Sequence, residues 1–177
     1  MKKMDFKQAS EMRYNIQPAE TFAEPMVYTK NPTPETKEYG KLIASGYYNG
    51  LNYYVKNIAG MHPTAYIEIP QGHRAYNMDF YECSKNHVSL NVHWGVTFQE
   101  GYLRTVDDNG GRGHKFIGWD YGHAWDFAGY YIGDKRMENL NYKKWTTEEI
   151  IAECKDAIDQ INALANYVLG RFQNDRM

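Results

Sequence analysis

The chain has 177 residues, which is enough for one domain with a hydrophobic core and too few for two. Its 22 acidic and 20 basic residues give a formal net charge of −2, a balance that does not favour a dedicated nucleic-acid-binding protein. It has two cysteines without a CxxC motif and no apolar run of the roughly 18 residues that a membrane span requires. We therefore expect an intracellular protein with free thiols and no membrane segment.

The N-terminal residues 1–40 are expected to form an arm that precedes a core domain of residues 41–177. Four prolines lie between residues 18 and 34, and proline removes backbone donors and favours extended chain. Within this arm the pattern allows a short helix over Met1–Arg13 and an edge strand over Met26–Thr29.

The core domain is predicted to begin with a β-hairpin. Two runs rich in β-forming residues, Lys41–Tyr48 and Leu51–Ile58, are separated by Asn49 and Gly50, a pair that tolerates positive φ at both turn positions. The alternating run Thr64–Ile69 then predicts a third strand.

A fourth strand is predicted over His87–Phe98, after a long mixed loop over residues 71–86, because apolar and polar side chains alternate there. The predicted core face comprises Val88, Leu90, Val92, Trp94, Val96 and Phe98. The other face carries Asn91, His93 and Thr97, which either contact a ligand or are ordinary solvent-facing residues.

A fifth strand is predicted over Lys115–Tyr121. One face of this strand is expected to carry Ile117, Trp119 and Tyr121, and the other face Phe116, Gly118 and Asp120. A glycine inside a strand often marks a bulge or the close approach of another chain segment, so we expect one of these at Gly118.

A long helix is predicted to end the chain. Thr146 and Glu149 form a capping-box pattern, and Gly170 is expected to end the helix. Its apolar stripe includes Ile150, Cys154, Ile158, Ile161, Ala165 and Val168, widened by Ile151, Ala157, Leu164 and Leu169. We expect this stripe to pack on the sheet face that carries Val92, Trp94 and Val96. The fold class is therefore α+β: a single domain with a mostly antiparallel sheet of about five strands, packed by a long C-terminal helix.

The segment Arg112–Phe127, RGHKFIGWDYGHAWDF, concentrates carboxylate, imidazole and indole groups. With His93 from the preceding predicted strand, its residues Asp120, His123 and Asp126 are candidate ligands for a divalent metal such as Zn²⁺, Mn²⁺ or Fe²⁺. The spacing matches no specific metal motif.

The same residues support two readings without a metal. In the first, His93, Asp120 and His123 are catalytic, and Asp120 or Asp126 orients His123 as a general base that acts on Thr97 or a bound water. In the second, Asp120 and Asp126 cap the loop and His123 donates to a backbone carbonyl. The candidate ligand-binding residues are Asn91, Thr97, Asp126, Trp119, Trp125 and His73.

Two segments of the chain, VHWGVTF and FIGWDYGHAWD, resemble a family of small uncharacterised proteins from bacteriophages and prophages. That family has an H-G-G-x-T-[FY] strand followed by G-[FW]-D-x-[AG]-H-x-x-D. The matching residues are His93, Gly95, Thr97, Gly118, Asp120, His123 and Asp126, and Pro70, Gly72 and His73 resemble a preceding P-x-G-H segment. The resemblance covers roughly residues 64–165. Two departures, Trp94 for a glycine and Trp125 for a small residue, would narrow a pocket.

The resemblance implies a phage origin and a shared His/Asp site, but no particular reaction. We expect a phage accessory protein in the cytoplasm of the infected host. On this reading it acts as an anti-defence inhibitor that binds a host protein or a small polar, nucleotide-like ligand. The alternative is a metal-dependent or His/Asp hydrolase acting on a phosphoester or similar polar substrate. A third hypothesis is a minor virion or assembly protein, but no feature of the sequence supports it.

Overall fold

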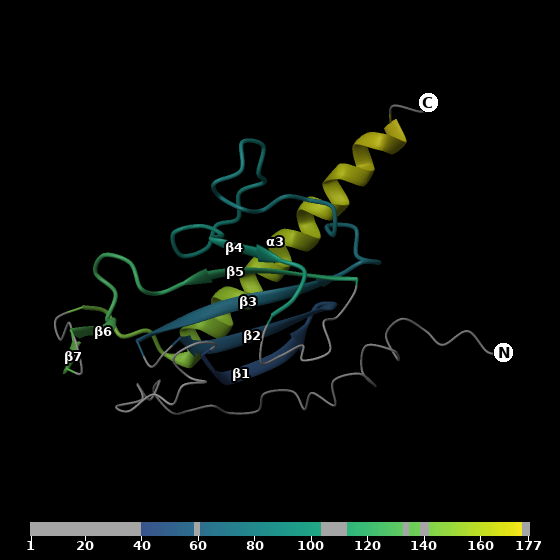
Figure 1. Ribbon diagram of the computed structural model, residues 1–177. Helices are drawn as coiled ribbons and strands as arrows, with labels where there is room; N and C mark the ends of the chain where they lie inside the picture. Colours follow the sequence, from purple (N-terminus) through teal and green to yellow (C-terminus); the bar gives the residue numbers. More distant parts are fainter. Residues whose placement is uncertain (1–39, 59–60, 104–112, 133–134, 139–141, 175–177) are drawn as a thin grey trace.

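The computed structural model describes residues 40–174 apart from 59–60, 104–112, 133–134 and 139–141. In this part of the chain an antiparallel five-stranded sheet packs against one long C-terminal helix, so the predicted α+β class is confirmed (Figure 1). The predicted arm, with its helix at Met1–Arg13 and its strand at Met26–Thr29, lies outside the described residues.

The strand order in the sheet is β1-β2-β3-β5-β4, and every neighbouring pair is antiparallel. The strands are β1 (Lys41–Tyr48), β2 (Leu51–Ile58), β3 (His62–Pro70), β4 (Phe98–Glu100) and β5 (His114–Asp120). The pairing of β3 with β5 places the start of β3 beside the end of β5, where Thr64 lies opposite Asp120. This end of the sheet carries the candidate site.

The predicted hairpin is confirmed at both of its strands and at its turn. Tyr48 pairs with Leu51 across the turn. Asn49 and Gly50 have φ values of 41° and 94°, the left-handed conformation that this residue pair adopts at little cost.

The predicted strand over His87–Phe98 is wrong, because only Phe98 at its end belongs to a strand. The chain turns at Trp94 and Gly95, where φ is 56° and 84°, and the N–H of Gly95 donates to the carbonyl of Val92 at 3.1 Å. Two consecutive left-handed residues cannot continue a strand. Residues 71–97 therefore form one long connection from β3 to β4.

The helix α3 (Thr147–Asn174) begins where the capping box predicts. The N–H of Glu149 donates to Oγ1 of Thr146 at 3.2 Å, and the N–H of Thr146 donates to Oε2 of Glu149 at 2.9 Å. The predicted end at Gly170 is wrong, because the helix continues for four more residues.

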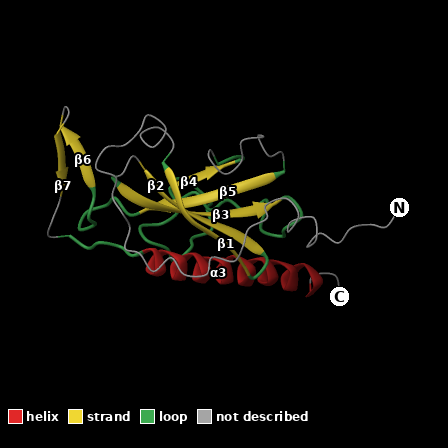
Figure 2. Cartoon of the chain, turned by 90° about the horizontal axis from the view of Figure 1, so that it is seen from below, coloured by secondary structure: helices red, strands yellow, loops and turns green. Residues whose placement is uncertain are grey.

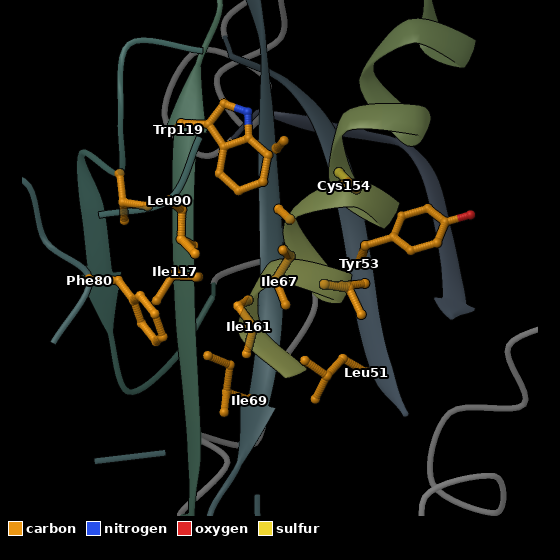
Figure 3. Close-up of a cluster of buried hydrophobic side chains, with 14 of the residues drawn as sticks. Leu51, Tyr53, Ile67, Ile69, Phe80, Leu90, Ile117, Trp119, Cys154 and Ile161 are labelled. Carbon is orange, nitrogen blue, oxygen red and sulfur yellow. The ribbon is translucent and has the colours of Figure 1, made fainter. Parts of the chain in front are cut away.

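The main core lies between α3 and one face of the sheet, as Figures 2 and 3 show. The buried apolar positions of the helix are Ile150, Cys154, Ala157, Ile158, Ile161 and Ala165. They pack with sheet residues that include Leu51, Tyr53, Val55, Ala65, Ile67, Ile117 and Trp119. Leu90 and Val96, from the long connection, join this core. The expected contact of the helix with Trp94 is wrong, because that indole is exposed.

The opposite face of the sheet has a second, smaller cluster of buried residues. Tyr54, Tyr66, Leu103 and Phe116 form it, with Phe98 packed against it. Glu68 is buried on the same face and accepts hydrogen bonds from Asn52 and Tyr54 at 3.0 and 2.7 Å. The predicted division of β5 into two faces is thus confirmed.

A second two-stranded sheet, which the sequence did not predict, follows the site segment. The strands β6 (Gly129–Ile132) and β7 (Lys135–Glu138) pair antiparallel, with Gly129 opposite Glu138. Figure 2 shows this hairpin beyond the end of the main sheet.

Candidate metal and acid–base site

The candidate site forms where three parts of the chain meet at one end of the sheet. His93 comes from the long connection between β3 and β4, while His123 and Asp126 come from the loop that follows β5. Trp145 lies just before α3, and Glu153 lies in the second turn of that helix. Hydrogen bonds and ring contacts join these segments, although they are far apart in the sequence.

Asp126 is the centre of this hydrogen-bond network and is 4% exposed. Its Oδ2 lies 2.7 Å from Nε2 of His93 and accepts the backbone N–H of His123 at 3.0 Å. Its Oδ1 accepts the indole N–H of Trp145 at 2.8 Å. The last two bonds hold both carboxylate oxygens, and Oδ2 is the oxygen that lies nearest to the two imidazoles.

His123 has one ring nitrogen that the surrounding protein does not satisfy. Its Nδ1 is buried and makes no hydrogen bond within the described part of the chain. The nearest carboxylate oxygens are Oδ1 of Asp120 at 3.5 Å and Oδ2 of Asp126 at 3.9 Å. A buried polar atom without a partner is uncommon and suggests that a proton, an ion or a ligand belongs there.

Asp120 and His62 lie next to the cluster of His93, His123 and Asp126. Oδ1 of Asp120 accepts the N–H of Gly122 at 2.9 Å. A Cβ atom at Gly122 would lie 3.0 Å from the His62 ring, so this glycine permits the close approach of the imidazole. Burial lowers the pKa of His62, and His123 acts in the same direction, while Asp120 and Asp126 oppose them. The lowered pKa favours a neutral ring that could bind a cation.

Aromatic rings hold His93 in place. Its imidazole stacks on Tyr121 with ring centroids 5.1 Å apart and 10° between the planes. It also contacts Trp145 and His123 edge-on, at 4.8 and 5.7 Å. With three ring neighbours, the imidazole has little freedom to turn away from Asp126.

Glu153 links the site to the core. Its Oε1 accepts the backbone N–H of His93 at 2.9 Å. Its Oε2 accepts the indole N–H of Trp119 at 3.0 Å and the hydroxyl of Tyr121. Burial and the adjacent negative charge of Glu153 raise the pKa of Tyr121, so the phenol stays protonated as a donor. A single helix carboxylate thereby fixes both the backbone of His93 and the ring beneath it.

Three donor atoms are close enough to bind one metal ion. They are a nitrogen of His93, a nitrogen of His123 and a carboxylate oxygen of Asp126, all within 4.8 Å of one another. Two imidazoles and one carboxylate are a common ligand set for catalytic zinc and for non-haem iron, and they leave coordination positions open. The indole of Trp145 would serve as an outer hydrogen-bond partner that orients the ligating carboxylate.

The structure also bears on the alternative that the two carboxylates cap the loop. Asp120 and Asp126 both accept backbone N–H groups of that loop, at Gly122 and His123. Asp126 also bonds to His93 and Trp145, which lie outside this loop, and capping the loop does not require these two bonds. Capping and ligand binding are compatible here, since a carboxylate oxygen can accept more than one partner.

Four of the proposed ligand-binding residues lie apart from this group. His73 bonds to Asn162 of α3 at 3.0 Å and lines a separate cavity of about 400 Å³ with Arg74 and Asn166. The backbone of Asn91 bonds to Gln160, two turns along α3 from Glu153. Trp119 is 1% exposed and belongs to the core. Thr97 is exposed beside β5, where its N–H donates to Gly118.

Trp94 borders the site, and Trp125 lies in the same loop as His123 and Asp126. The Trp94 indole stacks on His123 with ring centroids 5.2 Å apart, and the Trp125 ring meets Tyr142 edge-on at 5.5 Å. Trp94 and Trp125 are the two departures from the pattern of the phage family. Both have positive φ, a conformation that glycine adopts freely.

Sequence reasoning missed His62, Trp145 and Glu153. His62 could have been found from strand register, because an antiparallel pairing of β3 with β5 puts its first residue beside the residues that follow Asp120. Glu153 gives no such signal, since a glutamate at the edge of an amphipathic helix usually faces solvent.

In the described part of the chain, no helix combines the length and apolar character that crossing a membrane requires. Comparisons with known proteins return no matching family model, no matching curated protein and no matching solved structure.

Proposed function

We propose that the protein is a divalent-metal-dependent hydrolase that acts on a phosphoester or a similar polar substrate. The observation that carries this proposal is the donor set of His93, His123 and Asp126, whose ligand atoms lie within 4.8 Å of one another. The buried Nδ1 of His123, which has no hydrogen-bond partner among the described residues, supports it further, because a metal ion would supply one.

Five residues of the site have roles in this proposal. His93, His123 and Asp126 hold the ion, and the N–H groups of Trp145 and His123 keep the Asp126 carboxylate oriented. A bound divalent ion would lower the pKa of a coordinated water and offset the charge of a phosphoester. Asp120, with its Oδ1 3.5 Å from Nδ1 of His123, is placed to accept a proton from the attacking water.

The test is metal analysis of the full-length protein, together with hydrolysis of bis(p-nitrophenyl) phosphate in the presence of Zn²⁺, Mn²⁺ or Fe²⁺. We expect about one ion per chain. His123→Ala and Asp126→Asn should lose the ion. Activity should fall by more than the roughly 10- to 100-fold that loss of an outer hydrogen-bond partner of a ligand costs.

His73→Ala is the matched control, because it removes a half-buried histidine at the separate cavity. It should leave metal content and hydrolysis unchanged. Thermal unfolding of all three variants separates loss of the ion from loss of the fold. A wild-type protein that binds no ion, and whose melting temperature does not respond to added metal, would refute the proposal.

A second candidate is a phage accessory protein that binds a host protein in the cytoplasm of the infected cell, as an anti-defence inhibitor would. It is favoured by the large exposed aromatic residues, since aromatic side chains are enriched in protein interfaces. These residues are Tyr47, Tyr81, Trp94, Tyr102, Trp125 and Tyr167. This candidate becomes the stronger one if the metal analysis is blank and the site variants keep their fold.

A further inference from the structure

Two exposed tryptophans beside the candidate metal site have unusual backbone conformations. Trp94 and Trp125 are 60% and 72% exposed, and their φ values are 56° and 76°. For a bulky residue this conformation is a clear outlier. It persists only where the surrounding structure imposes it, and such residues concentrate at sites that bind ligands. Core packing does not explain these two residues, because their side chains are mostly in solvent.

The arrangement of the Trp94 indole leaves one of its faces for a ligand. The first face stacks on His123, with 14° between the planes. The side chain is nevertheless largely exposed, which leaves the second face to solvent. A flat ring placed there would continue the stack outward from His123. Trp125, two residues after His123, adds a second large exposed aromatic surface at the same loop.

Two lysine side chains lie close to the candidate metal site. Lys143 forms a bridge with Asp126 through the backbone, and its Nζ lies 3.4 Å from the ring centroid of Trp145. The Nζ of Lys144 lies 4.4 Å from the ring centroid of Phe127, the neighbour of Asp126. The Lys143 ammonium is already paired with Oε1 of Glu149 at 3.2 Å, so we assign the attraction of an anionic substrate to Lys144.

We propose that the substrate of this site is a nucleoside phosphate whose base stacks on Trp94. The inference rests on the proposed hydrolase function and specifies its substrate class. Bases stack on aromatic side chains with little dependence on their identity, because every base has a flat π-face. A nucleotide carries a flat ring at one end and a phosphoester at the other, which matches the indole surface and the His/Asp donors. A sugar phosphate shares this chemistry in part, since a sugar ring can also lie on an indole.

The experiment is a calorimetric titration of the full-length protein with AMP, CMP, GMP and UMP, and separately with glucose 6-phosphate. Trp94→Gly is the main variant, because glycine adopts the observed φ without strain and the protein should therefore fold. We expect the Kd for the nucleotides to rise by about tenfold or more in Trp94→Gly and by less in Trp125→Gly. Trp94→Phe should recover part of the affinity, and Tyr47→Ala, at an exposed aromatic residue on β1, is the control.

The outcomes separate this inference from the proposed function. Metal content should be the same in the wild type and both tryptophan variants. If nucleotides bind through Trp94 but no metal binds, the hydrolase proposal fails and the stacking surface stands. If metal binds but nucleotides do not, or if Trp94→Gly leaves their Kd unchanged, the inference is overturned. Glucose 6-phosphate binding that equals nucleotide binding and falls equally in Trp94→Gly would also overturn it, in favour of a sugar phosphate.

Discussion

At the scale of single residues, Glu153 shows how the core and the candidate site depend on each other. Its carboxylate accepts from the backbone of His93, from the indole of Trp119 and from the hydroxyl of Tyr121. Trp119 and Tyr121 are among the largest fully buried side chains. The group that positions His93 is therefore held by the interior of the protein, which favours a rigid site.

Replacing Glu153 with alanine is expected to destabilise the fold and to disturb the site. The backbone N–H of His93 and the hydroxyl of Tyr121 would lose their acceptor, whereas the indole N–H of Trp119 also donates to the Tyr121 hydroxyl at 3.0 Å. Each buried donor without a partner costs about 1–3 kcal/mol. Because water can reach part of this region, we expect a total loss of roughly 3 kcal/mol in the free energy of unfolding, measured by urea denaturation. The affinity for a divalent ion should fall as well, since the His93 backbone is no longer fixed.

The control for this prediction is Glu148→Ala, in the first turn of the same helix and exposed. It removes a favourable interaction with the helix dipole and should cost less than about 1 kcal/mol. Equal effects of the two substitutions would show that the bonds of Glu153 do not hold the site in place.

At the scale of secondary-structure elements, Gly118 explains how β3 and β5 approach each other. A Cβ atom there would lie 2.5 Å from Cδ1 of Tyr66 and 2.8 Å from the carbonyl oxygen of Ala65. The Tyr66 ring is buried and meets Phe98 edge-on at 5.3 Å, so it has no free space into which to move. The close approach that a glycine in this strand predicts is therefore an aromatic ring lying over the backbone of β5.

Gly118→Ala should consequently destabilise the protein by roughly 1–3 kcal/mol, the usual cost of overpacking a core. Urea denaturation measures the effect. Gly101→Ala is a matched control, because the nearest atom to its added Cβ is the carbonyl oxygen of His114 at 3.9 Å. We expect Gly101→Ala to change the free energy of unfolding by less than about 0.5 kcal/mol. If Gly118→Ala were equally mild, the tight contact with Tyr66 would not exist in solution.

Local patterns predicted those elements whose structure local chemistry determines. The turn at Asn49 and Gly50 and the capping box at Thr146 and Glu149 are examples, because each depends on residues that are neighbours in the chain. The error over residues 87–97 has a physical cause. Alternating apolar residues there do reach the core, but Trp94 turns the chain away from the strand path.

The candidate site could be predicted only in part, for a related reason. The residues His123 and Asp126 are close in the sequence, so their grouping could be read directly. Bringing His93 to Asp126 requires the path of the long connection, and Glu153 requires the rotation of α3 on the sheet. Tertiary packing sets both, and no local spacing encodes them.

At the scale of the whole molecule, the two faces of the main sheet differ in character. The helix-covered face is apolar, whereas the other face buries the polar side chains of Asn52, Lys56, Thr64 and Glu68 next to its aromatic cluster. Burying a charged group is costly, and a lysine responds by a lowered pKa. Burial lowers the pKa of Lys56 to about 8, and its Nζ lies 5.7 Å from the ring centroid of Tyr66.

This buried lysine predicts how the stability of the protein depends on pH. In the unfolded chain the pKa of Lys56 returns to 10.5, so between pH 8 and 10.5 the unfolded state binds more protons than the folded state. Stability should therefore rise with pH in this range. From pH 7 to 9.5 the expected gain is roughly 1–2 kcal/mol in the free energy of unfolding.

Lys56→Met isolates this effect, because it keeps the long apolar side chain and removes the titrating group. Urea denaturation of both proteins should be followed from pH 7 to 9.5. The upper limit avoids ionisation of tyrosine in the unfolded chain, which would lower stability where burial has raised the pKa of Tyr53 and Tyr66. The free energy of unfolding of the wild type should rise with pH relative to that of the variant. The difference between the two free energies should be largest at pH 7, where the wild type must bury an ammonium ion. Parallel curves would mean that Lys56 has a normal pKa in the folded protein, and that its ammonium group reaches water from this face of the sheet.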